Sequence, residues 1–240
     1  MTKLNIDEFV SSSISANQEI YNLIQTNHDN FKKPLSKGYG GDISLMMDIE
    51  AEKIFVKYLS KYGKIFSEES GEIGQGEFTI VIDPIDGSDN YKSNFPYFGS
   101  SVAIKKDDKV LAGVVTNFAN GDIFIKTDSF FKRGKLFKSE FLDVKKNSFD
   151  SVGIFERGYK SEVYSKKLRE IQVKYRIAGA FALSLAYAHE VSFVLFYGKI
   201  RSFDICAGKY MCEDLFLYED DDIFLVSKDE EMFNKIRKLI

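Results

Sequence analysis

The stretch Ile80-Val81-Ile82-Asp83-Pro84-Ile85-Asp86-Gly87-Ser88-Asp89-Asn90-Tyr91 decides the fold that we expect for this chain. Its first three residues are β-branched and apolar, which predicts a buried strand. Pro84 is expected to end the hydrogen-bond ladder because proline has no N–H group. Gly87-Ser88 is typical of the first residues of a helix. The sequence therefore predicts a strand-turn-helix unit with two carboxylates at the carboxyl end of the strand.

This unit carries groups that suit a cation and an anion side by side. Divalent hard cations prefer oxygen ligands, so the side chains of Asp83 and Asp86 and the carbonyl of Ile85 suit Mg²⁺. The amides of Gly87 and Ser88 would face a phosphate at the helix start, where the helix dipole favours negative charge. Asp-Pro and Asp-Gly are also common turn formers, so the stretch alone is equally compatible with a simple connection.

Two further acidic segments favour the chemical interpretation. Upstream, Lys64-Ile65-Phe66-Ser67-Glu68-Glu69-Ser70-Gly71 ends a short apolar run with paired glutamates. Downstream, Arg201-Ser202-Phe203-Asp204-Ile205-Cys206-Ala207-Gly208 opens an apolar helical segment with an aspartate. If folding brings these acids to the end of the strand, they repel one another unless cations compensate their charge.

The order and spacing of these motifs resemble the inositol monophosphatase superfamily. The resemblance lies in Glu-Glu-Ser at residues 68–70, D-P-I-D-G-S-x-N-Y at residues 83–91 and F-D-I-x-A-G at residues 203–208. A looser match, Gly41-Asp42-Ile43-Ser44-Leu45-Met46-Met47-Asp48, is similar to the family's paired aspartates ahead of a helix. Arg176-Ile177-Ala178-Gly179-Ala180 looks like the family's substrate turn. The match spans most of the chain.

The resemblance implies a fold and a metal centre. The fold would be α/β, or α+β, built as a layered αβαβα sandwich with the metal site between its two halves. The centre would hold two Mg²⁺ ions, with a weaker third on Glu68, and its ligands would be Glu68, Asp83, the Ile85 carbonyl, Asp86 and Asp204. In the family a metal-activated water attacks the phosphate ester, and no phosphoenzyme forms.

The resemblance also implies roles for catalytic and substrate-binding residues. The catalytic residues would be Asp48, Ser88 and Glu68, with the Ser88 hydroxyl in the place of the family's threonine. Ser88 would hydrogen-bond the attacking water, and Asp48 would orient Ser88. The substrate would contact Gly87, Ser88, Gly179, Ala180, Tyr197 and Arg201.

The sequence leaves the substrate less defined. Inositol-specific members place a glutamate seven residues before the aspartate of F-D, and Tyr197 stands there in this chain. Cationic side chains could meet a second phosphate, as in members that split fructose 1,6-bisphosphate, or could be solvated; they are Arg201, Lys199, Arg157 and Lys160. We expect a phosphoric monoester hydrolase for small sugar phosphates, with inositol 1-phosphate and fructose 1,6-bisphosphate as the first candidates.

Three other functions compete with this one. Superfamily members that act on 3′-phosphoadenosine 5′-phosphate usually carry D-G-T-x-E/D-F, whereas Asn90-Tyr91 is closer to the sugar-phosphate branch. A phosphatase of the haloacid-dehalogenase type needs D-x-D, but two residues separate Asp83 from Asp86. A regulatory or scaffold protein on this fold is disfavoured because all the metal-binding acids are present. Residues 212–215 replace the family's E-A-G-G turn, which we expect to affect packing more than catalysis.

The composition is typical of a globular protein. The chain has 240 residues, 44% hydrophobic and 29% charged, with a formal net charge of −3, which disfavours nucleic-acid binding through a basic face. No apolar run approaches the roughly 20 residues of a membrane span, and the N-terminus lacks a secretory signal. Cys206 and Cys212 are expected to stay reduced in a cytoplasmic setting. We expect two packed subdomains, residues 1–148 and 149–240, and by resemblance a lithium-sensitive homodimer.

Periodicity predicts alternating helices and strands around a central antiparallel meander. Helices are expected over residues 5–27, 44–61, 161–171, 179–189 and 204–212, and at the C-terminus. Strands are expected around Ile65, over residues 80–82, 101–104, 110–115, 122–125, 152–155, 173–177 and 192–197, and near Phe224. The three strands between residues 98 and 136 form the meander, and the part after Asp150 has the alternation of an α/β layer.

Overall fold

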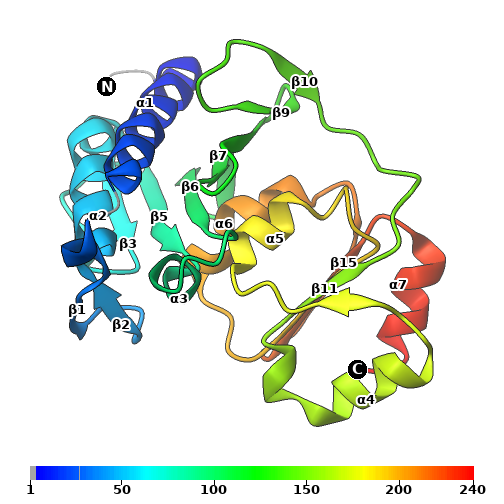
Figure 1. Cartoon of the computed structure of the whole chain (residues 1–240). Helices are drawn as coiled ribbons and strands as arrows, with labels where there is room; N and C mark the ends of the chain where they lie inside the picture. The colour runs from blue at the N-terminus through cyan, green and yellow to red at the C-terminus, as the bar shows by residue number, and fades with distance from the viewer. Residues whose placement is uncertain (1–3, 27) are drawn as a thin grey trace.

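The computed structural model describes residues 4–26 and 28–240, and Figure 1 shows its elements. The helices are α1 (Ile6–Gln25), α2 (Met46–Leu59), α3 (Ser88–Lys92), α4 (Glu162–Glu170), α5 (Phe181–Ala186), α6 (Ser202–Met211) and α7 (Glu230–Arg237), with short 3₁₀ turns η1 (Asp29–Lys32), η2 (Ser60–Tyr62) and η3 (Gly158–Lys160). The strands are β1 (Pro34–Lys37), β2 (Ile43–Leu45), β3 (Lys64–Ser67), β4 (Gly71–Ile73), β5 (Thr79–Asp86), β6 (Gly99–Lys106), β7 (Lys109–Asn117), β8 (Asp122–Thr127), β9 (Phe131–Lys135), β10 (Phe141–Asp143), β11 (Gly153–Glu156), β12 (Tyr175–Arg176), β13 (Val194–Tyr197), β14 (Phe216–Glu219) and β15 (Ile223–Ser227).

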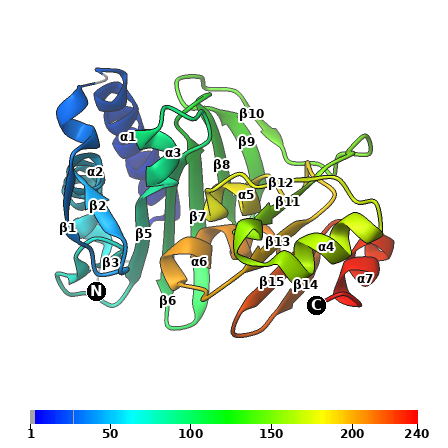
Figure 2. The same cartoon turned by 60° about the horizontal axis from the view of Figure 1, so that its bottom comes forward.

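These elements stack in five layers, which Figure 2 shows most clearly. Helices α1 and α2 cover one face of an eight-stranded sheet with the order β10-β9-β8-β7-β6-β5-β3-β4. Helices α5 and α6 lie between that sheet and a five-stranded sheet with the order β12-β11-β13-β15-β14, and α4 and α7 cover its outer face. This order of layers confirms the expected αβαβα fold class.

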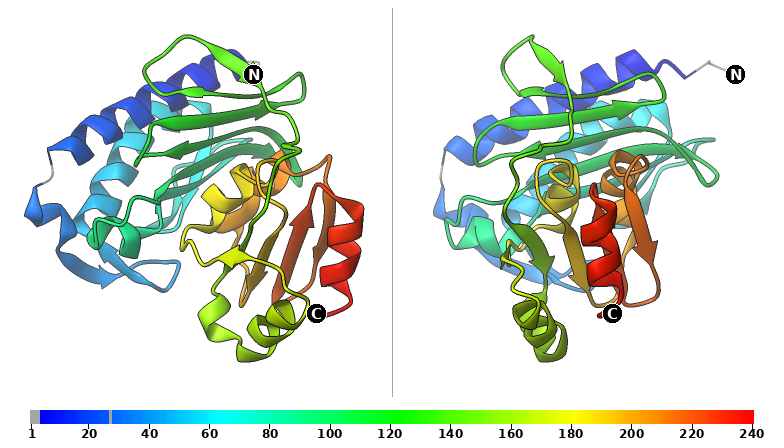
Figure 3. Two further views of the ribbon diagram at one scale, coloured as in Figure 1. Left: turned by 45° about the vertical axis from the view of Figure 1, so that its right-hand side comes forward. Right: turned by 90° about the vertical axis from the view of Figure 1, so that its right-hand side faces the viewer.

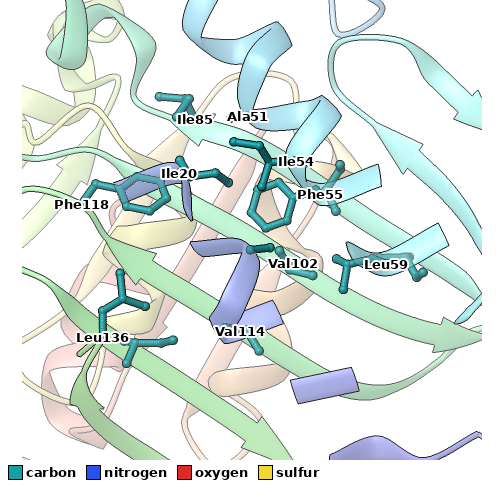
Figure 4. Packing of buried hydrophobic residues seen from close by; sticks show 14 of the residues in the cluster. Ile20, Ala51, Ile54, Phe55, Leu59, Ile85, Val102, Val114, Phe118 and Leu136 are labelled. Atoms are coloured by element: carbon teal, nitrogen blue, oxygen red, sulfur yellow. The ribbon is translucent and has the colours of Figure 1, made fainter. Parts of the chain in front are cut away.

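The largest core cluster lies between the first helical layer and the eight-stranded sheet (Figure 4). Ile20 of α1 and Phe55 of α2 point toward Val102 and Val114 of the sheet, and all four side chains are buried. Burying one side chain of this size stabilises the folded state by about 1.5–3 kcal/mol. This cluster therefore holds α1 and α2 against the eight-stranded sheet.

Small residues determine how closely α5 and α6 pack between the two sheets. Along β6, Val102 and Ile104 face the first core cluster, whereas Ala103 faces α5 and α6, as the period of two in a strand requires. Helices α5 and α6 touch closely at Gly208, where an added Cβ would lie only 2.6 Å from Cβ of Leu185. The absence of a side chain at Gly208 thus determines how deeply α6 sits between the two sheets.

The five-stranded sheet buries both of its faces. Along β13, Val194 and Phe196 pack toward α5 and α6, whereas Leu195 and Tyr197 pack with residues of α4 and α7. Figure 3 shows α4 and α7 on this outer side of the sheet. The two-residue period along β13 therefore decides which of its side chains face the centre of the molecule.

Most of the expected elements are present, with two differences. The antiparallel meander of β6, β7 and β8 is confirmed, and the helix expected over residues 5–27 is α1, although Asn27 lies outside the described residues. The prediction that Pro84 ends the ladder was wrong: pairing with β6 is interrupted between Asp83 and Asp86 and resumes at Asp86. The sequence did not predict the strands β1, β2, β4, β9, β10 and β14. Among the described residues, no helix has the length and apolar character needed to cross a membrane.

Candidate active site

A cavity of about 490 Å³ opens where the eight-stranded sheet, α6 and the turn after β11 meet. Strands β3 and β5 run parallel, so their carboxyl ends lie at the same edge of the sheet and deliver Glu68 and Asp83 side by side. Helix α6 enters from the third layer and carries Asp204 in its first turn. Three acids that are far apart in the sequence thus line one cavity.

The carboxylates of Glu68, Asp83 and Asp204 converge. One oxygen of each lies within 4.8 Å of the corresponding oxygens of the other two. Asp86 lines the same cavity, and its Oδ2 accepts a hydrogen bond of 2.7 Å from the amide of Leu183 at α5. Oδ1 of Asp83 is buried and has no hydrogen-bond partner. A buried carboxylate oxygen without a partner is costly, which means that this site fits a cation that would satisfy it.

Burial changes the protonation of these acids. It raises the pKa of Glu68 to about 8, with Arg201 opposing and Asp204 adding to the rise. Burial likewise raises the pKa of Asp86 to about 8 and places the pKa of Asp83 well above its usual range, where neighbouring carboxylates add to the effect. Hard divalent cations with oxygen ligands relieve this kind of repulsion.

The resemblance of the chain to the family predicts that Ser88 pairs with Asp48, and the structure places the two side chains in contact. The Ser88 hydroxyl lies 3.0 Å from Oδ1 of Asp48 and 2.9 Å from the carbonyl of Ile85. Oδ2 of Asp48 accepts a hydrogen bond of 2.5 Å from the amide of Leu45, and burial raises the Asp48 pKa to about 7. A carboxylate with this pKa is suited to exchange a proton near neutral pH.

Gly87 makes the turn between β5 and α3 possible. Its φ of +90° lies in the left-handed region, and a Cβ at this position would lie 3.1 Å from the carbonyl oxygen of Gly179 and 3.1 Å from Cβ of Ala180. The turn that carries Gly179 and Ala180 therefore packs directly against the β5–α3 turn. Gly179 of the expected turn lines the cavity as a result, whereas Ala180 is buried and is not among the lining residues described.

Sequence reasoning missed Glu156, which holds the turn at Gly179. This buried residue ends β11, and its Oε2 accepts a hydrogen bond of 2.8 Å from the amide of Gly179. Its Oε1 accepts a hydrogen bond of 2.5 Å from the Ser184 hydroxyl. The available signal was a carboxylate directly after the buried residues 153–155, the same pattern as at Asp83.

The four candidate cations occupy different surroundings. Arg157 and Lys160 line the cavity, whereas Lys199 is exposed and is not among the lining residues described. Arg201 lines the cavity, and its guanidinium pairs with two acids. Nε lies 2.8 Å from Oδ2 of Asp204, and Nη1 lies 2.9 Å from Oε1 of Glu68. Its guanidinium is therefore already paired and is not free for a phosphate.

Tyr197 does not line the cavity, contrary to the expectation from the sequence. Its ring packs against Tyr164 of α4 with 5.4 Å between centroids. The reason is the period of two along β13, which turns the preceding residue, Phe196, toward the cavity instead. Residues 212–215, where the sequence departs from the family's glycine turn, are also not among the lining residues described.

Without divalent cations, the protein is expected to lose stability as the pH rises from about 4 to about 8. Burial raises the pKa of Glu68 and Asp86 to about 8 and that of Asp48 to about 7, whereas unfolded carboxyls titrate near 4. The folded state therefore holds protons that the unfolded state releases, and higher pH favours unfolding. Thermal unfolding in a chelator at pH 5, 6, 7 and 8 should show a fall of at least about 5 °C.

The same titration with Mg²⁺ is the control. The cation should restore most of the stability at pH 8 and change little at pH 5, because it competes with protons for the same oxygens. A melting temperature that stays level or rises with pH in the chelator would contradict the charge assignment.

Comparison with known proteins gives the family. The model of the inositol monophosphatase family matches residues 5–215. A fructose-1,6-bisphosphatase/inositol-1-monophosphatase of Methanothermobacter thermautotrophicus is 31% identical over 205 residues, which cover 75% of this chain and 71% of that protein. Two solved structures share the fold. One inositol monophosphatase–fructose 1,6-bisphosphatase has a TM-score of 0.81 at 24% identity and covers 99% of this chain and 100% of its own. The IMPase of Thermotoga maritima has a TM-score of 0.75 at 23% identity and covers 96% of this chain and 97% of its own.

The matched region contains all the acids that line the cavity, from Asp42 to Asp204. The motifs at residues 68–70, 83–91 and 203–208, which carried the resemblance, also lie within it. Family match, identity and fold agree. The chain belongs to the inositol monophosphatase family.

Proposed function

We propose that this protein is a divalent-cation-dependent phosphoric monoester hydrolase for small sugar phosphates. The observation that carries the proposal is the convergence of Glu68, Asp83 and Asp204, with an unpartnered oxygen on Asp83, beside the contact of Ser88 with Asp48. Such a set of groups suits hydrolysis of an ester that carries negative charge. Family membership supports the same reaction class.

The cofactor that we propose is Mg²⁺, with two or three ions per site. Its ligands would be Glu68, Asp83, the Ile85 carbonyl, Asp86 and Asp204, an all-oxygen set of the kind that this ion prefers. Bound cations would activate a water and stabilise the departing oxygen of the substrate. The need for compensating charge is supported by the raised pKa of Asp83, which follows from burial and from nearby carboxylates.

The residues of the chain have separate tasks in this proposal. Ser88, whose hydroxyl hydrogen points to Asp48, accepts a hydrogen bond from the attacking water and so orients one of its lone pairs toward phosphorus. As the water passes its proton to the Ser88 oxygen, Ser88 passes its own hydroxyl proton to the carboxylate of Asp48. The amides of Gly87 and Ser88 face the phosphate oxygens. The turn at Gly179 and Ala180, fixed by Glu156, borders the rest of the substrate.

Two cationic side chains of the cavity lining favour a substrate with a second anionic group. Arg157 lines the cavity with its guanidinium carbon 4.9 Å from the ring centroid of Phe196, and Lys160 is an exposed lining residue. No glutamate stands at position 197 to bind the hydroxyl groups of inositol. Fructose 1,6-bisphosphate is therefore the first substrate that we propose, and inositol 1-phosphate is the second.

A phosphate-release screen with and without Mg²⁺ tests the function. The panel contains fructose 1,6-bisphosphate, fructose 6-phosphate, inositol 1-phosphate and 3′-phosphoadenosine 5′-phosphate. We expect metal-dependent release from the sugar phosphates, with the bisphosphate preferred by kcat/KM. Release of phosphate only from 3′-phosphoadenosine 5′-phosphate would mean that the substrates are nucleotides and not sugar phosphates. No release from any ester would favour a regulatory or scaffold role.

Other properties stay proposals of the same kind. The division into residues 1–148 and 149–240 is supported by the positions of the sheets, because β10 ends at Asp143 and β11 begins at Gly153. The free thiols of Cys206 and Cys212 support a reducing, cytoplasmic setting. A homodimer is proposed from family resemblance.

A further inference from the structure

Arg201 forms a fork-shaped pair with one of the converging acids. Its Nε donates to Oδ2 of Asp204 at 2.8 Å, and its Nη2 donates to Oδ1 of the same carboxylate at 3.0 Å. Its Nη1 lies 2.9 Å from Oε1 of Glu68. One guanidinium therefore contacts two of the three carboxylates whose oxygens converge in the cavity.

The same guanidinium also contacts the loop Gly38–Asp42. Its Nη1 donates to Oδ2 of Asp42 at 2.7 Å and to the carbonyl of Gly40 at 3.1 Å. The Asp42 side chain is 74% exposed, whereas that of Arg201 is 19% exposed. Arg201 consequently has partners at the rim of the cavity that do not belong to the converging set.

The loop itself is fitted closely to Glu68. The amide of Gly40 donates to the carbonyl of Glu68 at 2.7 Å, and that of Tyr39 donates to the carbonyl of Glu69 at 2.9 Å. A Cβ at Gly40 would lie 2.6 Å from Cγ of Glu68 and 3.0 Å from Cζ of Phe203. The rim partners of Arg201 are thus held at a fixed place beside the acids.

A fixed positive charge at this place has two opposite effects. It compensates the repulsion among the buried carboxylates and so stabilises the folded protein when no other cation is present. It also repels a divalent cation and occupies lone pairs on Glu68 and Asp204 that such a cation would use. Both effects depend on contact, because charge at a greater distance is screened by solvent.

We propose that Arg201 is a resident counter-ion that competes with divalent cations for Glu68 and Asp204. The proposal rests on the proposed function only in that these two acids hold the cation. When a cation binds, the guanidinium gives up its contact with Glu68 and keeps Asp42 and the Gly40 carbonyl. The two rim partners make this displacement inexpensive, since the guanidinium does not become unpaired.

Calorimetric titration of the full chain with Mg²⁺ and with Mn²⁺ tests the competition. Arg201→Gln is expected to bind the cation about tenfold more tightly than the wild type, because one repelling charge in contact with the ligands is gone. Without metal, the same variant should melt at a lower temperature, since the acids lose their counter-ion. Arg157→Gln is the matched control: it removes an equal charge from the lining of the same cavity at a residue that, within the described part of the chain, makes no ion pair with Glu68 or Asp204, and its metal affinity should change less than threefold.

The role of the rim is tested by a double-mutant cycle. Asp42→Asn should weaken cation binding in the wild-type background, because Arg201 then holds Glu68 more strongly. In the Arg201→Gln background the same change should have a much smaller effect, which reveals the coupling of the two residues. Arg201→Lys, which keeps the charge without the fork, should bind with intermediate affinity and reports on the site should Arg201→Gln fold poorly.

Two results would overturn the inference. Equal or weaker cation binding by Arg201→Gln, with folding verified by circular dichroism, would mean that Arg201 orients the ligands and does not compete with the metal. An equal gain in cation affinity in Arg157→Gln would mean that contact of the arginine with Glu68 and Asp204 is not needed for the effect. Absence of any cation binding by the wild type would instead defeat the proposed function, so the two failures are distinguishable.

Discussion

Asparagine in place of Asp83 is expected to lower phosphate release by about a thousandfold or more, because a lost ligand removes several kcal/mol of transition-state stabilisation by the cations. Asp83 is buried, its Oδ1 has no partner, and its carboxylate converges with Glu68 and Asp204. The amide keeps the shape of the side chain and removes its charge. The measurement is kcat/KM for the best substrate of the panel at saturating Mg²⁺.

The fold should survive this change. Burial raises the pKa of Asp83 well above its usual range, so the neutral amide is expected to make the metal-free protein more stable at pH 8, not less. Asp221→Asn, at an exposed aspartate in the turn before β15, is the control and should keep full activity. Near wild-type turnover by Asp83→Asn would exclude the metal centre as described.

Alanine in place of Ser88 is expected to lower kcat by about 10²–10⁴-fold, the usual contribution of a positioned proton-transfer group. In the proposed mechanism the Ser88 hydroxyl links Asp48 to the attacking water, and it lies 3.0 Å from Oδ1 of Asp48. Threonine keeps the hydroxyl, so Ser88→Thr should retain activity within about tenfold of the wild type. Steady-state kinetics on the three proteins measure both effects.

The kinetic pattern distinguishes this role from a purely structural one. Because the Ser88 hydroxyl donates to Asp48 and holds no cation in our proposal, Mg²⁺ affinity should be nearly the same in the alanine and threonine variants. KM should also change little, since the loss falls on the chemical step. Equal activity of Ser88→Ala and Ser88→Thr would show that the hydroxyl has no part in the reaction.

The fold could be predicted from the sequence where a segment has a strong period. The meander of β6 to β8 was clear from apolar runs divided by turn residues, and α1 was clear from the helical period of its apolar residues. The strands β4 and β10 have three residues each, too few for a period, and pair because longer neighbours present free edges. Pro84 shows a second limit: a bulge lets β5 pass the proline and pair again with β6, which composition does not reveal.

The site could be predicted in part for a related reason. Glu68 and Asp83 were identified because each follows an apolar run and belongs to a motif of the family. The parallel pairing that brings them together was seen only in the structure. Glu156 has the same signal but no motif that drew attention to it. The direction of a side chain at the end of a strand was not readable from spacing: counting back from Asp204 selected Tyr197, and Phe196 faces the cavity.

The pairing of Arg201 could not be foreseen, because it depends on Gly40 and Asp42, which lie 161 and 159 residues earlier in the sequence. A cation near an expected phosphate site is naturally assigned to the phosphate. In the folded chain its donors reach Asp42, Glu68 and Asp204. Only tertiary packing decides whether an arginine serves the ligand or the protein's own acids.

The missing side chain at Gly208 has a consequence for chemistry at a distance. Even one methyl group there would push α6 away from α5, because its carbon would lie 2.6 Å from Cβ of Leu185. Asp204 belongs to that helix, one turn nearer its start, and metal centres tolerate displacements of only about 0.5 Å. The distance between α5 and α6 thus determines where the carboxylate of Asp204 lies, although Asp204 takes no part in the contact between Gly208 and Leu185.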